Sequence, residues 1–342
     1  MRIILIGFGT VGQGLVEILR DKAADLKLSE NFAPRLVGVV TRTRGSLYSA
    51  EGLEPDALLT AIQTGTLDSY PDAPGLERGW DALQMIRAGA DVMIEAGPSN
   101  FETGQPALDY CCAALESGQH VVLANKGPVA VAYPDLAARA KAAGKLLRFE
   151  ATVMAGTPSI RLGTQALAGC KITQARGILN GTTNYILTQM EDGMTYADAL
   201  ARAQALGYAE ADPTADVDGW DAAAKAIILA AALFGARLTL ADMQVRGIRD
   251  LTPNDIAVAK AAGERWKLIA QVTPAGGSVQ PTRVPLAHPL AGVSGATNAV
   301  TYITDLLGDM TLVGAGAGRL QTGFGLLSDL LEINKFGIIS RL

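Results

Sequence analysis

The N-terminal segment combines an apolar strand with a glycine pattern that few folds allow. The strand reads Arg-Ile-Ile-Leu-Ile, Gly7, Gly9 and Gly12 follow it, and a helical pattern extends from Val11 to about Leu26. In this Gly-x-Gly-x-x-Gly spacing the first glycine makes a tight turn, the second lets the backbone approach a pyrophosphate, and the third lets the helix pack closely on the strand. The pattern therefore predicts a dinucleotide site. The residues expected to contact the cofactor there are Gly7, Phe8, Gly9, Thr10, Val11 and Gly12.

Strand and helix signals alternate through residues 1–150. This alternation predicts an α/β fold with a Rossmann-type doubly wound parallel sheet. Gly97 and Ser99 follow the strand expected at 91–96, and Lys126 follows the strand expected at 120–124. Because open α/β sheets bind ligands at the carboxyl ends of their strands, we expect these three residues at the cofactor site as well.

The residues after the second expected strand bear on the choice of cofactor. An enzyme that uses NAD usually has Asp or Glu here to bind the ribose 2′-hydroxyl. This chain instead reads Thr41-Arg42-Thr43-Arg44. A guanidinium group suits a 2′-phosphate, so NADP is favoured over NAD, with Arg42 as the contact. The alternative is that both arginines are ordinary surface residues of a loop.

The pattern changes after about residue 150 to longer helices with fewer strands, which predicts an inserted α+β domain. The glycine-rich run from Gly314 to Gly318 and the helix after it are expected to return to the first domain. The expected divisions are 1–135 for nucleotide binding, 136–305 for the substrate, and 306–342 for the returning segment.

Composition limits the function classes. The formal net charge is −5 and there is no basic run, which argues against a nucleic-acid partner. The longest apolar stretch, Ala226 to Ala236, is too short to span a bilayer. The N-terminus enters a strand directly and leaves no room for a signal peptide. We therefore expect a cytoplasmic protein without a membrane partner.

The cysteines and histidines provide no clear disulfide, zinc-binding or acid–base site. Three cysteines exclude a disulfide framework, and no Cys/His spacing suits zinc. His120 lies in a strand-like segment and His288 in a loop before Pro289, and we interpret both as structural residues. Lysine remains as the candidate acid–base group.

Lys225 lies near the start of a helix in which every later residue through Phe234 is apolar. Lysine is rarely buried unless it is paired or has a task. Asp221 lies four residues earlier and shares its helical face. The alternative is an ordinary ion pair on a solvated helix, but the helix is too apolar for that. We therefore expect a site here.

An acidic loop precedes this helix, and its charges repel one another unless a cation binds there. Its acidic residues are Glu210, Asp212, Asp216 and Asp218. The ammonium group of an amino-acid substrate would be such a cation. Lys126 and Lys225 belong to different expected domains, and a cleft between domains is a common place for a small substrate. A lysine with a lowered pKa can move the hydroxyl proton in an alcohol dehydrogenation.

The chain resembles the homoserine dehydrogenase family over segments that span nearly its whole length. The fixed residues of the family signature that match here are Ala203, Gly207, Asp212, Pro213, Asp216, Gly219, Asp221 and Lys225. The resemblance also covers residues 7–12, 124–128, 150–158, 176–184 and 314–318.

The resemblance implies reversible, NAD(P)-dependent interconversion of L-homoserine and L-aspartate 4-semialdehyde, on the route to threonine and methionine. It implies Lys126 and Lys225 as the acid–base pair, with Asp221 assisting proton transfer, and Gly316 at the cofactor. The residues implied to line the amino-acid pocket are Gly181, Thr182, Tyr208, Glu210 and Asp216. The main-chain carbonyls implied to bind a sodium ion are those of Glu150, Val153, Ala155 and Thr157.

The resemblance also implies a homodimer formed through the second domain. The chain stops soon after the returning helix, so we expect no regulatory domain and no threonine feedback. One alternative is a related amino-acid or aldehyde dehydrogenase, although none of the three cysteines sits in a recognisable nucleophile turn. A second alternative is a non-catalytic NADP-binding sensor.

Overall fold

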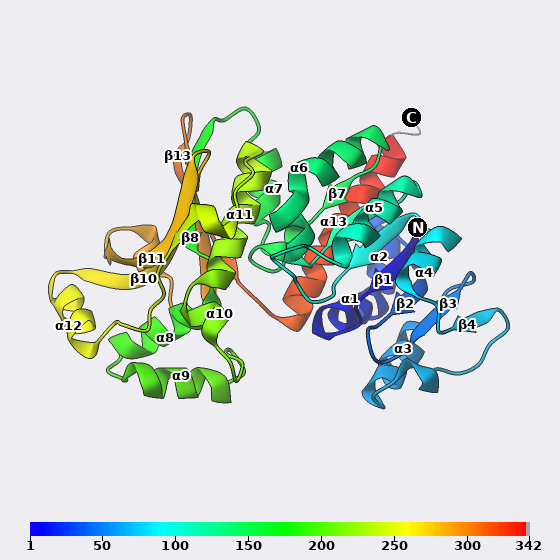
Figure 1. Ribbon diagram of the computed structural model, residues 1–342, viewed down its shortest axis with the longest axis horizontal. Coiled ribbons are helices and arrows are strands. Elements are labelled where there is room, and N and C mark those ends of the chain that lie inside the picture. Colours follow the sequence, from blue (N-terminus) through cyan, green and yellow to red (C-terminus); the bar gives the residue numbers. More distant parts are fainter. Residues whose placement is uncertain (340–342) are drawn as a thin grey trace. The chain divides into compact units, whose positions relative to one another are not determined.

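The computed structural model describes residues 1–339, which divide into two compact units. The first unit comprises Met1–Gly156 together with the chain from Gly318 onward, and the second comprises Thr157–Ala317. Each unit contains its own sheet (Figure 1).

The chain passes between the units later than the expected boundaries after residues 135 and 305. β7 (Leu147–Arg148) still pairs with β6 (His120–Leu123) of the first sheet. β13 (Gly308–Ala315) still pairs with β12 (Thr297–Thr304) of the second. Sheet pairing therefore sets these boundaries, and the sequence pattern did not show either of these edge pairings.

The first sheet is mainly parallel, and within residues 1–339 its strand order is β4-β3-β2-β1-β5-β6-β7. β1 pairs in parallel with β2 on one side and with β5 on the other. The strand order reverses at this point, which is where sheets of this kind bind dinucleotides. The arrangement confirms the expected Rossmann-type sheet. The other strands are β1 (Arg2–Ile6), β2 (Arg35–Val40), β3 (Ser46–Ser49), β4 (Leu76–Arg78) and β5 (Val92–Glu95).

Helices of the first unit include one from the far end of the chain. α13 packs against α1, and glycines on both helices make the approach close (Figure 1, red and dark blue). A Cβ atom on Gly323 would lie 2.7 Å from the backbone carbon of Gly14. Arg319 also donates to the Glu17 carboxylate at 2.9 Å. The helices are α1 (Thr10–Asp21), α2 (Ala23–Glu30), α3 (Pro55–Gln63), α4 (Ala82–Ala88), α5 (Ala107–Glu116), α6 (Lys126–Ala142) and α13 (Arg319–Ile339), with short turns η1 (Leu67–Ser69) and η2 (Glu150–Thr152).

The second unit is built on a mostly antiparallel sheet, whose strand order within the described residues is β13-β12-β8-β10-β11-β9. This is the expected α+β part of the chain. Its other strands are β8 (Ile172–Ile178), β9 (Met243–Val245), β10 (Glu264–Thr273) and β11 (Gly276–Pro285). Its helical segments are α7 (Ser159–Arg161), η3 (Leu162–Ala166), α8 (Gly181–Glu191), α9 (Tyr196–Ala205), α10 (Thr214–Val217), α11 (Trp220–Phe234), η4 (Leu240–Asp242), α12 (Pro253–Ala261) and η5 (Pro289–Gly292).

α11 is the buried helix of the second unit. Every residue from Ala222 to Ala231 is buried, and the helix contacts β8, β10 and β11. Its two ends are marked by Gly219 and Gly235, both in the left-handed region. A helix that is apolar on all sides is stable only when it is buried on all sides. Lys225 therefore lies inside the unit.

The segment from Gly45 to Gly79 contains two strands and a helix, α3. β3 and β4 add antiparallel strands to the sheet edge. These strands are too short for alternation of apolar residues to show them. No helix in residues 1–339 is both long enough and apolar enough to cross a bilayer.

Candidate active site

A cavity of about 800 Å³ lies in the first unit at the carboxyl ends of β1, β2 and β5. Gly7, Arg42, Gly97 and Ser99 line this cavity, as the sequence predicts for a cofactor site. Thr10, Val11 and Gly12 form the first turn of α1, and Phe8 is buried beneath it. The helix N-terminus is therefore at the end of the strand where an anion would bind.

The three glycines of the turn behave as a pyrophosphate-binding loop requires. Gly7 has a φ of 94°, and a Cβ atom there would lie 2.6 Å from the backbone carbon of Ala96. A Cβ atom on Gly12 would collide with the carbonyl oxygen of Gly7. A Cβ atom on Gly9 would meet nothing within 4 Å, so this backbone faces open space. The residues present therefore fit a dinucleotide.

Asn125 and Ser99 connect the loops after β5 and β6. The Asn125 side chain donates to the carbonyl of Pro98 at 3.0 Å and accepts from the backbone N–H of Gly127 at 2.9 Å. The backbone N–H of Lys126 donates to the Ser99 hydroxyl at 3.0 Å. Lys126 is the first residue of α6. The hydrogen bond to Ser99 fixes its backbone beside the loop that lines the cavity.

Lys225 is held by two partners inside the second unit. Its Nζ donates to Asp221 Oδ2 at 2.7 Å and to the carbonyl of Leu179 at 2.8 Å, and the residue is 8% exposed. Asn180 donates to Asp216 at 2.6 Å and to the same Asp221 oxygen at 3.0 Å. The structure therefore brings Lys225, Asp221 and Asp216 into one hydrogen-bonded network.

Asn180 is a member of this network that the sequence did not reveal as functional. It stands immediately before α8 and caps that helix, because its side chain accepts from the N–H of Thr183 at 2.9 Å. The Asn-Gly-Thr-Thr run gives the signal for a helix start. The same run does not show that the carboxamide also joins two aspartates. Burial, and next the charge of Asp221, raise the pKa of Asp216.

The remaining residues predicted to bind substrate are Gly181, Thr182, Tyr208 and Glu210. Gly181 begins α8, and the Thr182 hydroxyl donates to the carbonyl of Tyr208 at 2.7 Å. The Tyr208 ring packs on Tyr185, with ring centroids 4.9 Å apart. Glu210 is exposed in the turn that follows, where its carbonyl accepts from Gln204.

Besides Asp216, which accepts from Asn180, two of the acidic loop residues have protein partners. Asp218 forms an ion pair with Arg249, and Asp212 accepts from the N–H of Thr214 at 3.1 Å. Arg249 therefore supplies a cation for part of the loop.

The turn predicted to bind sodium has an unusual backbone. Met154 and Ala155 have φ values of 60° and 54°, so two successive residues are left-handed. Glu150 is 1% exposed, and its N–H donates to Asp329 at 2.9 Å. The Thr157 hydroxyl donates to the carbonyl of Ala315 at 3.1 Å. Main-chain carbonyl oxygens are ligands that a hard cation accepts.

Gly316 lies against a residue that the sequence did not single out. A Cβ atom on Gly316 would overlap the carboxamide of Asn298. Asn298 is fully buried, and neither polar atom of its side chain has a hydrogen-bond partner among the described residues. A residue larger than glycine at position 316 would therefore not fit against Asn298, whether or not Gly316 contacts a ligand.

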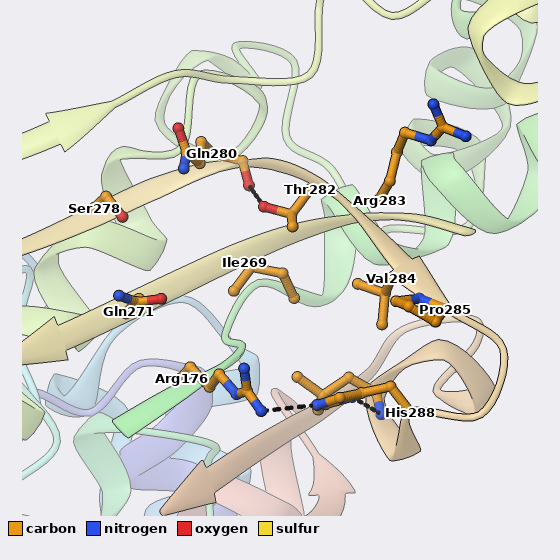
Figure 2. A pocket seen from close by; sticks show the side chains of 11 residues that line it. Arg176, Ile269, Gln271, Ser278, Gln280, Thr282, Arg283, Val284, Pro285 and His288 are labelled. Atoms are coloured by element: carbon orange, nitrogen blue, oxygen red, sulfur yellow. Dashed lines mark hydrogen bonds between the residues drawn. The ribbon is translucent and has the colours of Figure 1, made fainter. Parts of the chain in front are cut away.

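A separate cavity of about 200 Å³ lies against β8, β10 and β11 (Figure 2). Figure 2 shows Arg176 directed toward His288, and the two side chains are joined at 3.0 Å. Burial, and next the charge of Arg176, lower the pKa of His288. No residue predicted to be catalytic or to bind substrate lines this cavity. The other histidine, His120, accepts from the backbone N–H of Leu146 at 2.9 Å.

Comparisons with known proteins cover both units. The family model described as homoserine dehydrogenase matches residues 158–331, and the model for the homoserine dehydrogenase NAD binding domain matches residues 7–150. The chain is 41% identical to the NAD(+)-dependent homoserine dehydrogenase of Pseudomonas canavaninivorans, over 98% of this chain and 96% of that protein.

Solved structures agree with this. A putative homoserine dehydrogenase from Archaeoglobus fulgidus aligns with a TM-score of 0.87 at 36% identity, over 98% of this chain and 99% of that one. A hyperthermophilic archaeal homoserine dehydrogenase in complex with NADPH aligns with a TM-score of 0.83 at 29% identity, over 98% of both chains.

Proposed function

The chain belongs to the homoserine dehydrogenase family, and we propose that Lys225 is the acid–base group of its reaction. The reaction interconverts L-homoserine and L-aspartate 4-semialdehyde with a nicotinamide cofactor. The observation that carries the proposed role is the burial of Lys225 beside Asp221 in a helix that is otherwise apolar. A charge is expensive to bury, so a cation placed there has a task.

Proton transfer is the part of the reaction that these residues perform. A bound nicotinamide would accept or return the hydride. In alcohol oxidation, Lys225 Nζ takes the hydroxyl proton, and in aldehyde reduction it returns that proton to the carbonyl oxygen. Asp221 Oδ2 accepts from Nζ at 2.7 Å and holds it in place. Because Asn180 holds the same Asp221 oxygen, the lysine is kept in one orientation.

Lys126 is proposed as the second acid–base residue. Its backbone is fixed by Ser99 at the start of α6, beside the loop that lines the cofactor cavity. The proposed substrate contacts are the carboxylates of Glu210 and Asp216 to the ammonium group, with Gly181, Thr182 and Tyr208 around them.

NADP is the proposed cofactor, with Arg42 at the 2′-phosphate. Arg42 lines the cavity and is the second residue after the end of β2, where an enzyme that uses NAD usually has a carboxylate. NAD is the alternative, because the Pseudomonas canavaninivorans relative is named as NAD(+)-dependent. The other contacts proposed for the cofactor are the turn from Gly7 to Gly12, Gly97, Ser99, Lys126 and Gly316.

Three further features are proposals. The left-handed turn at Met154 and Ala155 supports a sodium ion on the carbonyls of Glu150, Val153, Ala155 and Thr157. A homodimer through the second unit is proposed from the family resemblance, and light scattering on the purified protein tests it. A cytoplasmic location stays a prediction from the sequence.

Steady-state turnover tests the function. The purified chain is assayed with L-homoserine and with L-serine, a shorter amino alcohol, each with NADP⁺ and NAD⁺. We expect L-homoserine to have the higher kcat/KM with either cofactor. A preference for another amino alcohol would indicate the related dehydrogenase. Cofactor binding without turnover would indicate the sensor.

A further inference from the structure

A buried carboxyl group at the end of β5 has no role in the function described above. Glu95 lines the cofactor cavity and is 3% exposed. Its Oε1 accepts from the backbone N–H of Gly97 at 3.0 Å. Its Oε2 is covered and has no hydrogen-bond partner among the described residues. A buried carboxylate oxygen without a partner is costly, so its retention requires an explanation.

The position of Glu95 in the sheet relates it to one half of the cofactor. β1 and β2 carry the glycine turn and Arg42, which are features of the adenosine half of a dinucleotide site. Glu95 belongs to β5, on the other side of the switch point, and is paired with Ile6 of β1. A dinucleotide bound in the manner usual for such sheets would therefore place its nicotinamide half on the side that contains Glu95.

The polar groups at the Glu95 carboxylate are the Asn125 side chain and the Gly97 N–H, which are both neutral. The facing residues on β1 and β6 are Ile6 and Leu123, which are apolar. Tyr110 and Cys111 face it from α5, and burial, followed by the charge of Glu95, raises the pKa of both groups, so they stay neutral near pH 7. On α6 the charged residue at this end is Lys126.

We propose that Glu95 makes the cofactor site favour the oxidised nicotinamide over the reduced one. The inference rests on the proposed function. The oxidised ring carries a positive charge and the reduced ring does not, while the phosphates are the same in both. Because Oε2 is covered, the carboxylate acts through its field and makes no direct hydrogen bond to the ligand. If the ring were bound about 10 Å from the carboxylate, an effective dielectric constant of about 20 would give a preference on the order of ten-fold.

The ionisation of Glu95 makes this preference depend on pH. Burial raises the pKa of Glu95 to about 7, although Asn125 and the Gly97 N–H oppose the shift. Above this pH the carboxylate is charged and attracts the oxidised ring. Below it the group is neutral and distinguishes the two forms less. The affinity for oxidised cofactor should therefore increase as the pH rises through about 7, relative to the affinity for reduced cofactor.

Equilibrium titration tests this proposal without turnover. The Kd of the oxidised and of the reduced cofactor is measured at pH about 6 and about 8. The proteins are the wild type, Glu95→Gln and Asp81→Asn. Glutamine keeps an acceptor for the Gly97 N–H. Asp81 is the matched control, because it is an exposed carboxylate that lines the same cavity and caps α4, a role asparagine can fill.

For the wild type and Asp81→Asn, we expect the ratio of the two Kd values to shift toward the oxidised form by on the order of ten-fold at the higher pH. For Glu95→Gln we expect a ratio that does not change with pH. A wild-type ratio that is the same at both pH values would overturn the proposal, whether or not the variant folds. An equal loss of both forms in Glu95→Gln would assign it a structural role instead. If the wild type bound neither form, the proposed function itself would be wrong.

Discussion

Glu210 and Asp216 differ in how the fold holds them, and this gives them separate parts in substrate binding. Asp216 is fixed by Asn180 at 2.6 Å, whereas Glu210 is exposed in a turn. An exposed carboxylate loses little by waiting for a cation, because water solvates it. Glu210 is therefore suited to bind the substrate ammonium group directly from water, and Asp216 both to contact that group and to maintain the network around Lys225.

Glu210→Gln is predicted to raise the KM for L-homoserine by about ten- to a hundred-fold while kcat changes less, since a hydrogen bond to a charged group contributes about 1.5–3 kcal/mol. Asp250→Asn is the control, because Asp250 is an exposed carboxylate of the same unit, near Arg246. Steady-state kinetics on both variants measure the changes in KM and in kcat separately. An unchanged KM in Glu210→Gln would make Glu210 a solvated loop charge.

Arg42 and Arg44 offer a matched pair for the cofactor. Both are exposed, but Arg42 lines the cavity and Arg44 is absent from its lining. Arg42→Ala is predicted to weaken NADP binding by about ten- to a hundred-fold and to leave NAD binding nearly unchanged. Arg44→Ala is predicted to change neither. Equal losses for NAD and NADP in Arg42→Ala would rule out a contact with the 2′-phosphate.

Glu95 also makes a prediction about stability. Burial raises its pKa from 4.5 to about 7 in the folded state, so the folded protein binds the proton more tightly than the unfolded chain does. The stability that the protonated group contributes is complete below pH 4.5 and is lost as the pH rises through about 7. Glu95→Gln cannot ionise. Its free energy of unfolding, relative to wild type, is predicted to rise over this range by up to about 3 kcal/mol.

Urea unfolding at pH about 5 and about 8 measures this difference. Asp81→Asn, which removes an exposed carboxyl group, is expected to show no such growth with pH. A difference between wild type and Glu95→Gln that stays constant would contradict the raised pKa.

At the scale of elements, the contact between α1 and α13 stabilises the first unit. Gly323→Ala would place a Cβ atom 2.7 Å from the backbone of Gly14. Overpacking of this kind typically costs about 1–3 kcal/mol, and we predict a loss of that size in the free energy of unfolding. Gly337→Ala in the same helix is the control, since its Cβ atom would meet nothing within 4 Å. Equal stability of the two variants would show that the helices can separate without cost.

The elements that the sequence predicted are those with a strong local signal. The glycines of residues 7–12 require a strand, a turn and a helix in that order, and the structure has all three. The apolar run after Lys225 required a buried helix, and α11 is one. β3 and β4 were missed because their pairing depends on β2, a neighbour in space and not in the local pattern.

The missed site residues have the same physical explanation. Asn180 gives a helix-cap signal, and its second role depends on Asp216 and Asp221, which lie far along the chain. Glu95 ends an apolar strand, and nothing in that strand shows that Ile6 and Leu123 will surround it with apolar atoms. Burial and partners at long range are properties of the fold, so a single sequence does not display them.

At the scale of the molecule, the two units have different tasks. The first has the dinucleotide cavity and contains Lys126, and the second has the network of Lys225, Asp221 and Asp216. The units were expected from the change in pattern near residue 150, but their edges were set by sheet pairing at β7 and β13. Hydride transfer depends on the first unit, and the proton at the substrate oxygen is proposed to depend on Lys225 of the second.

The most direct test of this account is to replace Lys225, the proposed proton carrier, with alanine. For Lys225→Ala, turnover of L-homoserine and the Kd of the cofactor are measured on the same preparation, with Lys260→Ala, an exposed lysine of α12, as the control. We predict that kcat falls by about a hundred- to ten-thousand-fold, the usual contribution of a positioned acid–base group. The cofactor Kd and the circular dichroism spectrum should stay near wild type, and Lys260→Ala should turn over normally. Turnover close to wild type in Lys225→Ala would contradict the central claim that this buried lysine moves the substrate proton.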